Sequence, residues 1–132
     1  MSASIPEYYF HTQFASEDKI SHWPIHFAII AEANDKSITA DSVETAEDLK
    51  TYLINHFSWV KPLIEIDSDI QRRVPCFAVN AGWEEACTIG HYYRHEVIYY
   101  VSDNTLSVTF CDGRRKPYVV DGFLKRFLLD EN

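Results

Sequence analysis

The sequence predicts an α+β fold of the ferredoxin-like, split β-α-β class: a two-layer sandwich with an added C-terminal hairpin strand and a short terminal helix. The chain shows the order strand, helix, strand, strand, helix, strand. Two of the strand segments are apolar on both faces, as central strands covered on two sides are. A third contains a proline, which a sheet tolerates at its edge. In this fold the first and third strands are central and the second is an edge, and the segments occupy those places.

Length and composition predict one domain over residues 1–132. A chain of 132 residues has the usual size of a single domain. Hydrophobic residues make up 46% and aromatic residues 14%, which is enough to form a core. We divide the domain into an irregular aromatic lead-in (1–24), an α/β core (25–111), and a basic turn with a C-terminal helix (112–132).

The first half of the core contains two predicted strands around a helix. Residues 26–33 are apolar on both alternating faces, which indicates a central strand. Asp41 and Glu44 have the spacing of an N-cap residue and its partner at N3, which predicts the start of an amphipathic helix of about four turns. Residues 59–67 predict an edge strand, in which one face carries Val60, Ile64 and Ile66 and the other carries Lys61 and Glu65.

The second half predicts three strands and two helices. The apolar run 74–79 indicates another interior strand, and Gly82 and Glu85 begin a helix. Residues 97–101 and 105–110 predict a hairpin that turns at Asp103 and Asn104, because short polar side chains tolerate turn dihedrals. The last predicted helix covers 122–129, and its apolar side contains Phe123, Leu124, Phe127 and Leu128.

A resemblance to a small bacterial family, domain of unknown function 3293, covers roughly residues 25–111. It is carried by the segment His26 to Asn34, the strand Pro75 to Val79, and the stretches 84–86, 89–90 and 97–100. The chain departs from the family pattern in three places: Asp35 follows Asn34, residues 74–76 are Val-Pro-Cys, and His95 stands near a glutamine position. The resemblance implies no assigned activity.

Charge and cysteine content restrict the classes of partner. Twelve Lys and Arg against twenty Asp and Glu give a net charge of −8, which argues against a nucleic-acid binder. Three cysteines without paired spacing predict a reducing cytoplasm. No apolar stretch approaches the roughly 20 residues of a membrane-spanning helix, so no membrane association is predicted. No cofactor is predicted.

A metal site is the sharpest chemical pattern in the sequence. His91 and His95 are four residues apart on a predicted exposed helix face, with Cys87 one turn earlier and Glu84 beside it. This spacing could present several ligands to one zinc or nickel ion. A solvated helix face is the favoured interpretation, because a site also needs supporting groups around its ligands.

Other polar groups are weaker candidates. A cysteine nucleophile would need a partner histidine, and Cys76 and Cys111 are interpreted as packing thiols. Glu65, Asp67 and Asp69 are interpreted as a solvated turn rather than a cation site. Two basic clusters, at 72–73 and 114–116, could bind an anion or be exposed charge.

The aromatic content is the best functional lead. Nineteen aromatic residues exceed what one small core hides, and aromatic side chains are enriched at interfaces. A sheet with both helices on one face leaves its other face to be covered. Either the N-terminal aromatic residues and the C-terminal helix cover it, or a partner chain does.

Two functions follow. The first is a non-catalytic, acidic cytoplasmic module that binds another protein, such as a basic toxin or nuclease that it masks, or a second copy of itself. Its candidate contacts are Glu44, Glu47 and Asp48. The second is a small-molecule or anion-binding domain, or an enzyme, that uses the loop after the first strand. Its candidate contacts are Asn34, Asp35, Trp83, Arg72 and Arg73.

Overall fold

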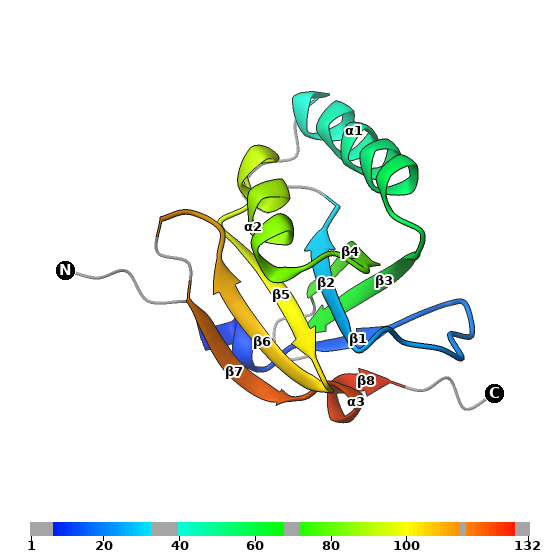
Figure 1. Cartoon of the computed structure of the whole chain (residues 1–132), viewed down its shortest axis with the longest axis vertical. Coiled ribbons are helices and arrows are strands. Elements are labelled where there is room, and N and C mark those ends of the chain that lie inside the picture. The colour runs from blue at the N-terminus through cyan, green and yellow to red at the C-terminus, as the bar shows by residue number, and fades with distance from the viewer. Residues whose placement is uncertain (1–6, 33–39, 68–71, 114–115, 129–132) are drawn as a thin grey trace.

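The structure, a computed structural model, describes residues 7–32, 40–67, 72–113 and 116–128 (Figure 1). In chain order its elements are η1 (Glu7–Phe10), β1 (Gln13–Ala15), β2 (His26–Ala31), α1 (Ala40–His56), β3 (Val60–Asp67), β4 (Arg72–Val79), α2 (Trp83–Tyr92), β5 (Val97–Ser102), β6 (Thr105–Phe110), β7 (Pro117–Gly122), α3 (Phe123–Arg126) and β8 (Phe127–Leu128).

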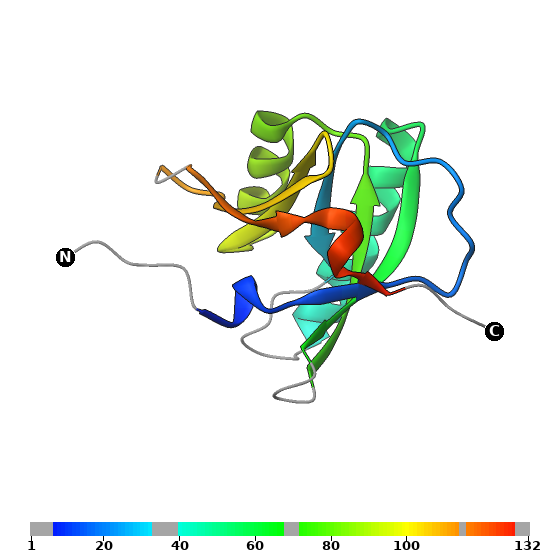
Figure 2. The same ribbon diagram turned by 90° about the horizontal axis from the view of Figure 1, so that it is seen from below.

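All of these strands belong to one sheet, in the order β7-β6-β5-β2-β4-β3-β1-β8. The pairs are antiparallel except β1 with β8, so the sheet is mixed. A flat sheet of this width would hold its two edge strands about 34 Å apart at about 4.8 Å per strand. The edge strands β7 and β8 are joined by the four residues of α3, which span at most about 18 Å with their flanking bonds. The sheet therefore curls strongly, as a half-barrel (Figure 2).

The predicted ferredoxin-like sandwich is wrong. The described chain is mostly sheet, and three short strands outside the predicted core extend and curl it. These are β1, β7 and β8, of three, six and two residues. Their sequences carry no alternating apolar pattern, so that pairing with β3, β6 and β1, rather than local sequence, determines their conformation.

Two apolar clusters lie on the two sides of the curled sheet. The outer cluster lies between the sheet and helices α1 and α2, and it includes Ile30, Leu49, Leu53, Phe77 and Ile89. The inner cluster lies inside the curl, and it includes Phe14, Phe27, Tyr99, Phe110 and Phe123. Strands β2 and β4 contribute to both clusters, as expected for the two runs that are apolar on both faces.

The chain itself covers the inner cluster. Tyr9, Phe10 and Trp23 from the lead-in pack against it, together with Trp59 and Phe127. The ring of Trp23 lies within 6 Å, centroid to centroid, of four other aromatic rings. Of the two alternatives for this face, the N-terminal aromatic residues and the C-terminal elements are therefore its cover.

Strand β3 differs from its prediction in two ways. It lies between β4 and β1 rather than at an edge, but β1 pairs only with residues 64–66, so Pro62 faces β4 alone. Its buried residues are Leu63, Glu65 and Asp67, whereas Ile64 and Ile66 are half-buried. The predicted orientation was thus inverted, because the curl turns the acidic face inward, where Thr12 and Tyr99 bind the Glu65 carboxylate.

The C-terminal region also differs from its prediction. Residues 122–129 were expected to form one helix, but α3 is a single turn that leads into β8. The β5–β6 hairpin is confirmed, and both turn residues have positive φ, 49° at Asp103 and 66° at Asn104. This is the conformation that short polar residues support in two-residue hairpin turns.

Helix α2 ends in a tight turn against the sheet. The N–H of His95 donates to the carbonyl of Gly90 at 2.8 Å, and that of Arg94 donates to His91 at 3.0 Å, which together form a Schellman motif. Arg94 occupies the left-handed position with φ of 67°. Gly90 is buried, and a Cβ there would lie 2.6 Å from the sulfur of Cys111. The absence of a side chain at Gly90 lets the helix approach the sheet.

Candidate functional site

The exposed side of α1 and the end of α2 form an acidic surface rich in tyrosine. We define the tyrosine–acid surface as Glu47, Asp48, Tyr52, Tyr92 and Tyr93. Glu47 and Asp48 are exposed, and Tyr92 is 77% exposed. The C-terminal end of α2 lies beside α1 (Figure 1). Sequence reasoning identified the two acidic residues but not the tyrosines. The signals for the tyrosines were the aromatic excess of the whole chain and, for Tyr52, its position four residues after Asp48 on the predicted helix.

Contacts between side chains order this surface. The rings of Tyr92 and Tyr93 meet edge to face at 4.9 Å, and the ring of Tyr52 stacks on His56 at 4.0 Å. Burial raises the pKa of Tyr93, and the neighbouring Tyr92, Asp48 and Tyr52 raise it further. Asp48 and Tyr52 of α1 thus lie close enough to Tyr93, the residue that follows α2, to act on it electrostatically. Because its pKa is raised, the hydroxyl of Tyr93 remains a protonated donor at neutral pH.

The interior of the half-barrel holds a buried polar cluster. The hydroxyl of Tyr99 donates to Glu65 Oε2 at 2.6 Å, and Thr12 Oγ1 donates to the same oxygen at 3.1 Å. Glu65 is 5% exposed, and Thr12 and Tyr99 are buried. Burial and then the Glu65 carboxylate raise the pKa of Tyr99 well above its usual range. The cluster joins the lead-in to β3 and β5, so it stabilises the cover of the inner core.

The expectation of a solvated turn at Glu65 and Asp67 is therefore wrong, since both lie buried in β3. Asp69 lies outside the described residues. The three cysteines are buried and free of disulfides. Burial raises the pKa of the Cys76 thiol well above its usual range, and Glu65 raises it further, which disfavours the reactive thiolate. This agrees with the interpretation of Cys76 as a packing residue.

The residues of the predicted small-ligand site are only partly described. Asn34 and Asp35 lie outside the described residues, and so does the side chain of Arg72. The side chain of Glu44, a predicted contact for a protein partner, also lies outside them. Arg73 is exposed on β4. The indole of Trp83 packs against the outer cluster, and its N–H donates to Thr109 Oγ1 at 3.3 Å. Trp83 thus has a structural role, and the ligand site stays a prediction.

The predicted metal-ligating face of α2 is not assembled. Cys87 is buried under the helix, and His95 follows the helix and is only 8% exposed, while His91 is exposed. Across 7–32, 40–67, 72–113 and 116–128, no three His, Cys, Asp or Glu side chains group as metal ligands. The Schellman turn explains the difference, because it turns the chain inward before His95.

His95 is an unusual buried base. Its Nε2 atom is buried without a hydrogen-bond partner. Burial lowers the pKa of His95 to about 4, against a smaller opposing effect of a hydrogen bond with the Ala31 backbone. The imidazole is therefore neutral at pH 7, and its protonation would place a charge inside the protein.

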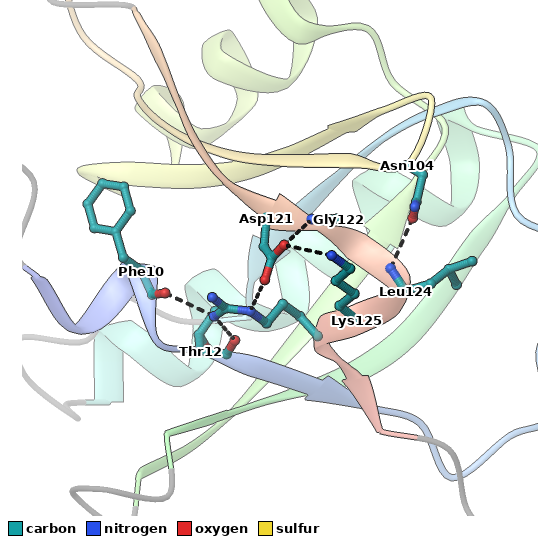
Figure 3. A network of polar contacts seen from close by, with 8 residues as sticks. Phe10, Thr12, Asn104, Asp121, Gly122, Leu124 and Lys125 are labelled. Atoms are coloured by element: carbon teal, nitrogen blue, oxygen red, sulfur yellow. Dashed lines mark hydrogen bonds and ion pairs between the residues drawn. The ribbon is translucent and has the colours of Figure 1, made fainter.

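Arg126 joins the two ends of the described chain through its contacts with Phe10, Thr12 and Asp121, which Figure 3 shows close together. Arg126 donates to the carbonyls of Phe10 and Thr12 at 2.9 and 3.2 Å, and its Nε donates to Asp121 at 3.1 Å. The Gly122 N–H and then Arg126 lower the pKa of Asp121. The predicted basic cluster 114–116 has no part in this contact. Its residues 114 and 115 lie outside the described ranges, and the amine of Lys116 lies 5.5 Å from the ring centroid of Tyr118.

Comparison with known proteins finds no matching family model, no matching curated protein and no matching solved structure. The resemblance to domain of unknown function 3293 therefore stays a prediction. None of the helices in the described part of the chain combines the length and the apolar character needed to cross a membrane.

Proposed function

We propose that this protein is a cytoplasmic interaction module that binds a basic protein through the tyrosine–acid surface. The observation that carries the proposal is the proximity of Asp48 to Tyr52 and Tyr93, with Tyr92 largely exposed beside them. Tyrosine contributes a large contact area at a low entropic cost and offers a hydroxyl to the partner. Adjacent carboxylates attract basic side chains over long range, and the net charge of −8 reinforces this attraction.

Two further observations support the proposal. The described fold covers its own inner core, so the sheet does not need a partner for its stability. The three buried cysteines without disulfides fit a reducing compartment.

The test is capture of partners from a native-host lysate by the immobilised protein. The charge-reversal variant E47K/D48K removes the acidic part of the surface. The matched control E17K/D18K makes the same change of charge in the exposed loop after β1. We expect a stoichiometric basic protein that elutes with salt, that the control retains and that E47K/D48K loses. Equal capture by both variants would refute the proposal.

A further inference from the structure

A small hollow lies at the far end of the β5–β6 hairpin, away from the tyrosine–acid surface. Its volume is about 190 Å³. Phe27, Val101 and Phe123 line it and are each at most 2% exposed. Ile25 and Leu124 also line it and are 68% and 59% exposed. The hollow is therefore an apolar depression with an apolar rim, and it is smaller than the roughly 300 Å³ at which pockets for drug-sized ligands begin.

Hydrogen bonds of the backbone and of the Asn104 side chain fix the segments around the hollow. The N–H of Asp103 donates to the carbonyl of Ile25 at 2.9 Å. Asn104 accepts the N–H of Phe123 at its backbone oxygen, at 2.7 Å, and the N–H of Leu124 at its side-chain oxygen, at 2.9 Å. The hairpin turn is thus bonded to both sides of the hollow. A preformed site of this kind loses little entropy when it is filled.

One charged residue, Asp103, lies among the lining residues. It is exposed at the turn, beside the apolar rim. An occupant that complements the hollow combines an apolar stem with a cationic end. An arginine side chain has this composition, because its methylene groups pack on apolar surface and its guanidinium binds a carboxylate with two parallel hydrogen bonds.

We propose that this hollow binds one arginine side chain of the basic partner, with the stem on the exposed rim residues Ile25 and Leu124 and the guanidinium at Asp103. The size of the hollow fits one side chain, and the net charge of −8 favours a cationic occupant. The identity of the occupant as part of a protein rests on the proposed function. The existence of an arginine-binding hollow does not depend on the proposed function, and it can be tested without any partner.

The experiment is an NMR titration of the ¹⁵N-labelled protein with N-acetyl-arginine methylamide. The uncharged N-acetyl-norleucine methylamide measures the contribution of the apolar stem alone. We expect saturable shifts confined to amides of residues 23–27, 101–104 and 123–124, with the arginine probe binding more tightly than the norleucine probe. Unsaturable or dispersed shifts would overturn the proposal, and so would equal affinity for the two probes.

A variant pair tests the charge. D103N keeps a residue that tolerates positive φ, and D18N removes one charge from an exposed position elsewhere. Because the carboxylate of Asp103 is exposed, we expect D103N to lower the affinity for the arginine probe about threefold. Its affinity for the norleucine probe should not change, and D18N should leave both affinities unchanged. An unchanged affinity of D103N for the arginine probe would refute the role of Asp103. If the titration fails but partner capture succeeds, only the arginine-binding hollow is refuted. If the titration succeeds but partner capture fails, only the proposed function is refuted.

Discussion

The buried imidazole of His95 predicts that the protein loses stability as the pH falls. The pKa of His95 is lowered to about 4 in the folded protein, against the ordinary value of 6.5. Between these values the unfolded chain binds a proton and the folded protein does not, so protonation favours unfolding. The stabilisation is complete above pH 6.5 and is lost progressively down to pH 4. At about 1.4 kcal/mol per pKa unit, the loss is about 3 kcal/mol.

The assay is urea unfolding of the wild type and two variants between pH 4 and 7. H95N keeps an N–H near the position of Nδ1 and removes the titratable ring. H91N removes an exposed histidine that, together with His95, lines a surface depression at the end of α2. The stability advantage of the wild type over H95N should decrease by about 3 kcal/mol from pH 7 to pH 4, whereas H91N should follow the wild type.

Parallel pH profiles of wild type and H95N would refute this reasoning. Should H95N fail to fold, an NMR titration of the His95 ring in the wild type decides the same point. A midpoint near 4 supports the account, and a midpoint near 6.5 contradicts it.

Three further substitutions test the packing of the fold by urea denaturation. Gly90→Ala should destabilise the protein by about 1 to 3 kcal/mol, because the added methyl group overpacks the contact between α2 and the sheet. Gly113→Ala should change stability little, because nothing lies within 4 Å of the added methyl group. Equal effects of the two substitutions would contradict the close approach of α2 to the sheet. Arg94→Gly should stabilise by about 0.5 kcal/mol, because glycine accepts the positive φ at the helix end, and a clear loss would show that the side chain matters more. Arg126→Leu should lower the free energy of unfolding by about 1 to 2 kcal/mol through lost hydrogen bonds and should accelerate amide exchange in residues 9–15. Lys125→Leu, at an exposed neighbouring position, is the control and should change neither. Unchanged exchange in Arg126→Leu would refute the role of Arg126 in holding the lead-in.

The parts of the fold that could be predicted are those that local sequence determines. The doubly apolar runs identified β2 and β4 as interior strands, and Asp103-Asn104 identified the hairpin turn. Amphipathic spacing identified α1, whose Leu49 and Leu53 are fully buried. In these segments burial and turn geometry leave one consistent conformation.

The rest depends on contacts between distant segments. The inward orientation of Glu65 requires Thr12 and Tyr99, which lie 53 and 34 residues away along the chain. The alternation of apolar and polar residues along a strand predicts that the apolar residues face the core. It cannot predict a buried carboxylate that is stabilised by hydrogen bonds from distant side chains. The burial of His95 likewise follows from the turn at Arg94, where an arginine adopts a conformation that glycine usually occupies.

The candidate site was predicted in part for the same reason. The acidic charge of α1 is visible in its sequence, and Glu47 and Asp48 are exposed as the hypothesis required. Tyr52 follows Asp48 by four positions on α1, a spacing that makes them neighbours on one helix. Tyr93 follows Tyr52 by 41 positions, and only the position of the end of α2 beside α1 brings it near these two residues.

The affinity of the captured partner at increasing ionic strength tests the central claim most directly. We predict that E47K/D48K lowers the affinity and flattens its dependence on salt, while E17K/D18K keeps both close to the wild type. Equal losses in the two variants would mean that overall charge, rather than the tyrosine–acid surface, attracts the partner, and would contradict the account.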